Sequence, residues 1–150
     1  MSIRIAPALF RILLAEDDVD DAEILCHAAR KSVPKVLMQV VHRGEEVIDI
    51  LSGGASEQDP DRGIRPSLIL LDIALPGKSG LQVLSWIRER PEFVRIPVIM
   101  LTGSIDPDDV HRALSLGANS YLMKPASTSA LEAMVQSLVC YWSALNRTGF

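Results

Sequence analysis

Five side chains that can bind ions or transfer protons stand at the ends of apolar runs in this sequence. Glu16 and Asp17 follow the first run, Asp72 follows another, Thr102 ends the next and Lys124 follows the last. Three carboxylates brought close together repel one another unless a proton or a cation lies between them. A hard divalent ion such as Mg²⁺ accepts oxygen ligands and neutralises such a group. The residue types therefore indicate a metal site beside an ammonium and a hydroxyl group.

The lysine and the threonine suit a tetrahedral anion next to that ion. The ammonium of Lys124 supplies a point charge, and the hydroxyl of Thr102 supplies a hydrogen bond. Asp72 would then be the nucleophile that accepts a phosphoryl group, while the metal and Lys124 neutralise charge during transfer. An isolated acid after a strand can equally cap the next turn, so this interpretation requires that the five groups converge.

The fold must bring these groups together, and the apolar spacing indicates how. Short continuous apolar runs predict five buried strands, at residues 12–15, 36–41, 68–71, 97–101 and 119–123. Helical spacing predicts five helices, from residue 20, at 45–51, after Gly80, after Asp106 and from Ser129. This alternation predicts an α/β fold, a doubly wound parallel sheet with helices on both faces. The carboxyl ends of parallel strands share one edge, where such sheets place their ligands.

Capping residues mark the last two helices. Asp106 is the expected N-cap, Pro107 the first helical residue and Gly117 the C-terminal stop. We expect three residues of this helix to face inward, namely Val110, Ala113 and Leu114. Ser129 and Glu132 have the spacing of a capping box. The helix that they open has an apolar face of Leu131, Met134, Val135, Leu138, Trp142 and Leu145.

Length and composition favour one globular domain. We expect residues 1–150 to form it, with a core at about 10–142, short extensions at both ends and no effector domain after residue 150. Hydrophobic residues make up 48% of the chain and charged residues 23%, which excludes a disordered or fibrous chain. Residues 52–66 are rich in Gly, Asp and Pro and predict an exposed loop, whose role the sequence leaves open.

Charge and cysteine usage exclude several classes of partner. The net charge is −4, and the fifteen Lys and Arg residues form no stripe, so we expect no nucleic-acid binding. Arg4, Pro7 and Arg11 interrupt the apolar N-terminus, which argues against a signal peptide or a membrane span. Cys26 and Cys140 lie far apart in sequence, each in a helical pattern. We therefore expect two reduced thiols of a cytoplasmic protein and not a disulfide or a metal pair.

Four segments, in this order, resemble the receiver domain of two-component response regulators, which has a flavodoxin-like fold. They are LLAED, LLDIALPGKSG, VIMLTG and GANSYLMKP, and all four lie within residues 12 to 125. The resemblance implies that Asp72 is phosphorylated by a histidine kinase with Mg²⁺ or Mn²⁺. It also implies that Glu16, Asp17, Asp72 and the Ala74 carbonyl bind the metal. A protein of this kind catalyses only its own phosphorylation and dephosphorylation.

The resemblance also assigns roles on the last two strands. Thr102 and Lys124 match the phosphate contacts, and Tyr121 matches an aromatic residue that changes rotamer together with Thr102. The bond from Lys124 to Pro125 matches one that is usually cis in the family.

Three residues near the phosphoacceptor depart from the family pattern or bear on how long it stays phosphorylated. Glu16 stands where aspartate is common, and its extra methylene favours contact with the metal through a bound water. Ala74 has no polar side chain at a position that influences hydrolysis of the acyl phosphate. Ser104 lies at the other such position.

A narrower resemblance is to stand-alone regulators that are paired with phytochrome-type histidine kinases. The segment PSLILLDIALP, the long loop before it and the tail helix with Tyr141 and Trp142 carry this likeness. It implies such a kinase as the partner. The apolar face of the last helix also suggests a homodimer.

Two alternatives remain open at this point. Asp18, Val19 and Asp20 spell the acid-x-acid motif of haloacid-dehalogenase-like phosphatases, in which Asp18 would be the nucleophile. The segment LLDIALPGKSG favours the receiver interpretation instead, in which Asp18 points off the strand end and caps or solvates the loop. The other alternative is a binding scaffold with a receiver fold that works without phosphorylation.

Overall fold

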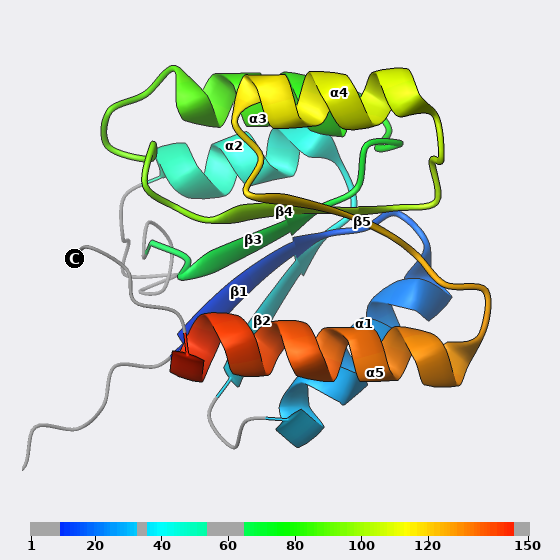
Figure 1. Ribbon diagram of the computed structural model, residues 1–150. Helices are drawn as coiled ribbons and strands as arrows, with labels where there is room; N and C mark the ends of the chain where they lie inside the picture. Colours follow the sequence, from blue (N-terminus) through cyan, green and yellow to red (C-terminus); the bar gives the residue numbers. More distant parts are fainter. Residues whose placement is uncertain (1–9, 33–35, 54–64, 146–150) are drawn as a thin grey trace, which may run out of the picture.

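Five strands and five helices alternate along the chain in the computed structural model, which describes residues 10–32, 36–53 and 65–145 (Figure 1). The strands are β1 (Phe10–Ala15), β2 (Val36–Val41), β3 (Leu68–Leu71), β4 (Val98–Thr102) and β5 (Ser120–Met123). The helices are α1 (Val19–Ser32), α2 (Gly44–Ser52), α3 (Gly80–Arg88), α4 (Pro107–Leu116) and α5 (Thr128–Cys140). A π-helical turn, Tyr141–Leu145, continues α5.

The strands form one parallel sheet in the order β2-β1-β3-β4-β5, which confirms the predicted fold class. The chain runs from β1 outward to β2 and then returns to place β3 on the other side of β1. The connection that follows β1 therefore leads to β2 on one side, and the connection that follows β3 leads to β4 on the other side. The strand order reverses between β1 and β3. In open α/β sheets, ligands bind outside the carboxyl ends of the strands at such a point.

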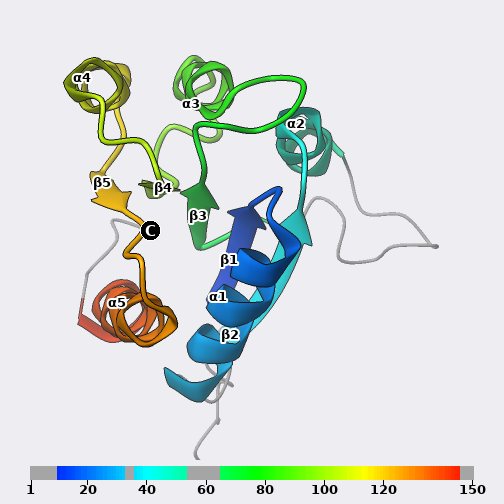
Figure 2. The ribbon, with the colours of Figure 1, turned by 90° about the vertical axis from the view of Figure 1, so that its right-hand side faces the viewer.

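Helices cover both faces of the sheet and bury its central strands β3 and β4 completely, whereas the edge strands β2 and β5 are partly exposed. α1 and α5 pack on one face, while α2, α3 and α4 pack on the other (Figure 2). On β3, Leu68 and Leu70 face α1 and α5, whereas Ile69 and Leu71 face the opposite layer, and all four are fully buried. Because side chains alternate across a strand, a strand buried on both faces must be apolar throughout.

The predicted caps of α4 are confirmed. The Asp106 carboxylate accepts a hydrogen bond from the Asp108 N–H (3.0 Å), Pro107 opens the helix, and Gly117 ends it at a φ of 104°. Of the three residues expected to face inward, Ala113 is buried but Leu114 is half exposed, so that expectation is wrong for Leu114. The reason is that Ala113 is the only fully buried residue of α4, whose inward face is therefore narrow.

The predicted N-cap of α5 is wrong by two residues. Ser127, not Ser129, is the N-cap, and its hydroxyl accepts a hydrogen bond from the Ala130 N–H (3.1 Å). Ser127 has the extended backbone that an N-cap requires, whereas Ser129 already lies inside the helix.

Three of the sequence expectations fall partly outside the described residues. They concern most of the 52–66 loop, the N-terminal residues 1–9 and the side chain of Leu145. Within the described part of the chain, no helix combines the length and the hydrophobicity that crossing a membrane requires.

Candidate functional site

Adjacent strands place the three predicted acids next to one another. β1 pairs with β3 so that Ala15 lies opposite Leu71, and the next residues, Glu16 and Asp72, leave the sheet side by side. The backbone N–H of Asp72 donates to the Ala15 carbonyl (3.2 Å), and that of Glu16 donates to the Val41 carbonyl (3.0 Å). Hydrogen bonds of the sheet therefore hold the backbone of both acids.

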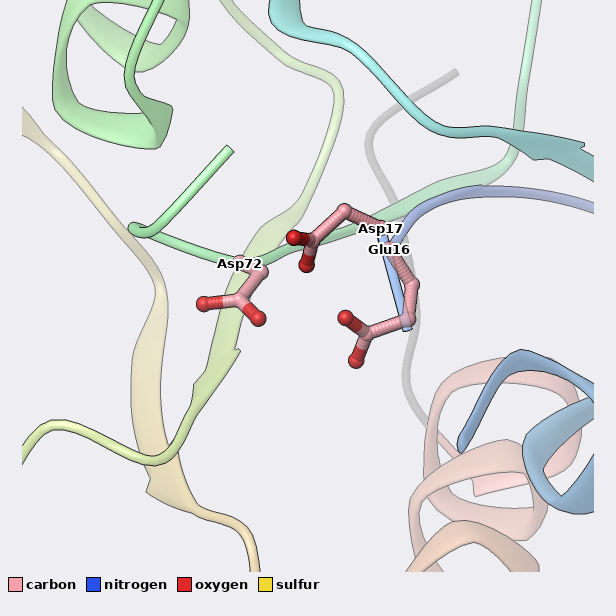
Figure 3. A group of neighbouring side chains, drawn as sticks. All are labelled: Glu16, Asp17 and Asp72. Carbon is pink, nitrogen blue, oxygen red and sulfur yellow. The ribbon is translucent and has the colours of Figure 1, made fainter. Parts of the chain in front are cut away.

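Glu16, Asp17 and Asp72 form what we call the acid cluster. Their carboxylates point toward one another, and one oxygen from each lies within 4.8 Å of the others (Figure 3). The Glu16 and Asp72 residues are only 1% and 5% exposed, whereas Asp17 is exposed to solvent. Two buried carboxylates and one accessible carboxylate, all oxygen donors, fit a hard divalent cation that keeps part of its water shell.

Lys124 lies against this cluster. Its backbone N–H donates to the Thr102 carbonyl (2.8 Å), which extends the pairing of β4 and β5 by one residue. Its ammonium forms an ion pair with Glu16 and another with Asp72, whose Oδ2 is 3.1 Å away. The ammonium therefore balances part of the negative charge that the buried carboxylates bring together.

Burial and mutual charge shift the pKa values of Glu16 and Lys124. Burial raises the pKa of the Glu16 carboxyl to about 7, although its hydrogen bond with Lys124 partly opposes this. Burial alone would lower the pKa of the Lys124 ammonium, but the bond with Glu16 and the charge of Asp72 raise it overall. Without a metal, Lys124 is charged and Glu16 changes its charge near neutral pH.

Two hydrogen bonds fix the orientation of the Asp72 carboxylate. Its Oδ1 accepts from the Ala74 N–H (3.1 Å), and its Oδ2 accepts from Lys124. The loop that carries Ala74 folds back on Ile73, just after β3, because the N–H groups of Leu75 and Gly80 both donate to the Ile73 carbonyl (3.0 and 2.9 Å). This tight loop keeps Ala74 beside Asp72.

Thr102 and Tyr121 both contact Ser104, in the loop between β4 and α4. The buried Thr102 hydroxyl oxygen accepts from the Ser104 N–H at 3.4 Å, and the Tyr121 hydroxyl donates to the Ser104 carbonyl at 3.0 Å. Burial raises the pKa of Tyr121. The Ser104 hydroxyl in turn donates to Asp109 of α4 (2.6 Å), so this serine ties the loop to the helix and to β5.

The expected cis bond between Lys124 and Pro125 is absent. All peptide bonds of the described residues are trans, so this expectation is wrong for this structure. The trans form is the lower-energy one for most bonds that precede proline.

Sequence reasoning missed one group at the site. Asp21, in the first turn of α1, places its Oδ2 3.2 Å from the Lys124 ammonium. The available signal was its position four residues after Asp17, one turn along the helix that follows the acids. Asp18 has a capping role, one of the two expected for it: its Oδ1 accepts from the Asp21 N–H (3.0 Å) in the first turn of α1.

A doubly wound sheet with an acid cluster and a lysine at its carboxyl edge is the architecture of a receiver domain. The chain matches the family described as the response regulator receiver domain over residues 12–136, and it belongs to that family. The match supports the receiver interpretation and gives the haloacid-dehalogenase alternative no support.

Curated relatives and solved structures agree with this assignment. The response regulator Rcp1 of Synechocystis is 36% identical over 132 residues, which cover 87% of each chain. The probable methanogenesis regulatory protein FilR2 of Methanothrix harundinacea is 34% identical, over 93% of this chain and 87% of its own. The phosphorylated cyanobacterial phytochrome response regulator RcpA superposes with a TM-score of 0.86 at 32% identity, over 95% of this chain and all of its own. The Mn²⁺-bound form of Rcp1 gives 0.83 at 33% identity, over 93% and 99%.

Proposed function

We propose that this chain is a phosphorylatable switch that takes a phosphoryl group from a histidine kinase onto Asp72. The observation that carries the proposal is the position of Asp72, held between two further carboxylates and the Lys124 ammonium at the carboxyl edge of the sheet. An Asp72 oxygen would form a bond to phosphorus while the bond from phosphorus to the kinase histidine breaks. The electron pair of that bond stays on the imidazole nitrogen, which then takes up a proton.

Glu16, Asp17, Asp72 and the Ala74 carbonyl would hold Mg²⁺ or Mn²⁺ in this proposal. Such an ion, when bound, neutralises charge on the transferred group. The chain's own contribution is to orient and stabilise that group. Lys124 supplies a positive charge beside Asp72, and Thr102 is the hydroxyl at the end of the neighbouring strand β4.

The raised pKa of Glu16 predicts that stabilisation by a divalent cation depends on pH. Between about pH 4.5 and 7 the folded protein binds more protons at Glu16 than the unfolded chain does, so metal-free stability falls as pH rises through this window. A cation binds the charged carboxylate and therefore stabilises more as Glu16 loses its proton. We expect the increase in melting temperature with MgCl₂ to grow from about pH 5 to about pH 8.

Glu16→Gln is the control for this prediction, since it keeps the size of the side chain but cannot titrate. In this variant the pH dependence should flatten. If MgCl₂ raises the melting temperature of the wild type equally at about pH 5 and about pH 8, titration of Glu16 does not control stabilisation by the cation.

Incubation with acetyl phosphate and Mg²⁺ tests the proposed function. We expect intact mass spectrometry to show one added phosphoryl group, and peptide mapping after borohydride reduction to place it on Asp72. A mark on Asp18 would support the phosphatase alternative. If no group is added under any condition, the protein is a scaffold and the proposal fails.

Phosphorylation would change the protein surface through Thr102 and Tyr121. We infer that both side chains move inward together, because both contact Ser104 and a change at one alters the contacts of the other. The altered surface would lie on α4, β5 and α5. A local change of charge would in this way shift the equilibrium between two packing arrangements of the same elements. Ala74 and Ser104 would influence how long the phosphorylated state lasts.

We propose a phytochrome-type histidine kinase as the partner. The similarity to RcpA supports this choice, since RcpA is described as a cyanobacterial phytochrome response regulator. The proposed setting is the cytoplasm, with residues 1–150 as a single receiver domain whose core spans about 10–142. The free thiols Cys26 and Cys140 are compatible with a reducing compartment.

We further propose that a second copy of the chain binds at α5 and β5. An apolar groove of about 300 Å³ lies there, and Tyr141, one of its lining residues, is 49% exposed. The groove is lined by Ile99, Ser120, Leu122, Met134, Ser137, Leu138, Tyr141 and Trp142. Light scattering with and without phosphodonor should detect a dimer that Tyr141→Glu weakens. A wild-type monomer at all concentrations in both states would contradict this proposal.

A further inference from the structure

Lys124 has one more carboxylate partner than the acid cluster provides. Its ammonium contacts Glu16, Asp72 and, at 3.2 Å, Asp21. An ammonium has three N–H donors, so three carboxylates can engage all of them at once. The Lys124 side chain is only 14% exposed, and the side chain of Asp21 is 32% exposed. Asp21 is therefore the most solvent-accessible of these three carboxylate partners.

Local hydrogen bonds determine where Asp21 lies. The Asp18 carboxylate caps the first turn of α1 by accepting from the Asp21 N–H, and the Ala22 N–H donates to the Asp18 carbonyl (3.0 Å). An acid in the first turn is also favoured by the helix dipole. The position of Asp21 is thus set by α1 and not by the sheet edge that carries the acid cluster.

This separate origin matters once a cation binds. A divalent ion in the acid cluster would compete with Lys124 for Glu16 and Asp72, which are partners of both. Asp21 is not a member of the acid cluster, so its contact with the ammonium does not compete with the cation. After phosphorylation of Asp72, Asp21 would likewise keep its charge.

We propose that Asp21 is a positioning residue that keeps the Lys124 ammonium beside Asp72 while a cation occupies the acid cluster. The proposal rests on the proposed function, because it assigns a part in phosphorylation of Asp72. Without Asp21, the lysine would lose the only one of its carboxylate partners among the described residues that neither the metal nor the phosphoryl group affects. It would then spend more time in solvent and less time at the reacting group.

Asp21→Asn and Asp20→Asn form a matched pair for the test. Each removes one negative charge from the first turn of α1, but no ion pair in the described residues joins Asp20 to Lys124. We expect the phosphorylation rate constant at saturating Mg²⁺ and acetyl phosphate to fall about three- to fivefold in Asp21→Asn relative to Asp20→Asn. Asp21→Glu should recover part of the rate, since it restores the carboxylate.

A second measurement does not depend on phosphorylation. Acetylation of Lys124 by acetic anhydride, quantified by mass spectrometry against Lys78 at saturating Mg²⁺, reports how firmly the ammonium is held. We expect faster labelling of Lys124 in Asp21→Asn than in Asp20→Asn.

Equal labelling, or equal rates of phosphorylation, in the two variants would overturn the proposal. If the wild type takes up no phosphoryl group, the proposed function fails and the part of Asp21 in phosphorylation fails with it. The labelling experiment would still show in that case whether Asp21 holds Lys124.

Discussion

Asp72→Asn is expected to abolish phosphorylation by acetyl phosphate. The amide is a poor nucleophile compared with the carboxylate, and it removes one of the three negative charges that would hold the cation. The fold should persist, because the carbonyl oxygen of asparagine can still accept from the Ala74 N–H. Intact mass spectrometry should show no added group at any time, while circular dichroism should resemble that of the wild type.

Asp17→Asn serves as the matched control, because Asp17 belongs to the acid cluster but is exposed and is not the proposed phosphoacceptor. This variant should need more Mg²⁺ for the same rate and yet become phosphorylated at a high concentration of the ion. Addition of a phosphoryl group to Asp72→Asn at the wild-type rate would place the reaction on another residue and refute the assignment.

Gly80→Ala is expected to destabilise the protein by about 3 kcal/mol, at the upper end of the usual cost of overpacking. The first residue of α3 packs so closely on the end of β3 that an added methyl group would overlap the Asp72 carbonyl. Backbone atoms cannot move aside as the end of a flexible side chain can. Urea denaturation should show the loss as a lower midpoint, and the affinity for Mg²⁺ should fall because Asp72 is displaced.

Gly103→Ala is the comparison for this variant. A methyl group at Gly103 would have no neighbouring atom within 4 Å, so we expect it to change the unfolding midpoint little. Equal unfolding midpoints for Gly80→Ala and the wild type would contradict this prediction. They would mean that α3 can move away from the end of β3 with little loss of stability.

The central strands could be predicted because burial on both faces leaves an unambiguous pattern. Leu68 to Leu71 must be apolar throughout, and the polar residue that follows marks the edge of the sheet. The same logic predicted the strand ends at Glu16, Asp72 and Thr102. It could not fix the start of α5, since Ser127 and Ser129 are both good caps and only the backbone conformation distinguishes them.

The contact between Asp21 and Lys124 could not be predicted in this way. These residues are 103 positions apart, and the distance between a helical side chain and a strand end depends on how α1 packs on the sheet. Parallel pairing tells which strand ends lie at one edge, but it does not give the height or tilt of a helix above that edge. The exposure of Leu114 escaped prediction for a similar reason, because helical spacing does not report the width of the buried face.

The hydrogen bonds from the Glu16 and Asp72 N–H groups to neighbouring strands limit how a signal can leave the site. Moving either backbone would break bonds of the sheet and disturb the core beneath it. A new charge on Asp72 must therefore act on parts of the chain that can rearrange without unfolding the sheet. The loop around Ser104 is such a part, since side-chain contacts from Tyr121 and Asp109 hold it. Amide hydrogen exchange should accordingly change most after phosphorylation at residues 103–106 and least in β1 and β3.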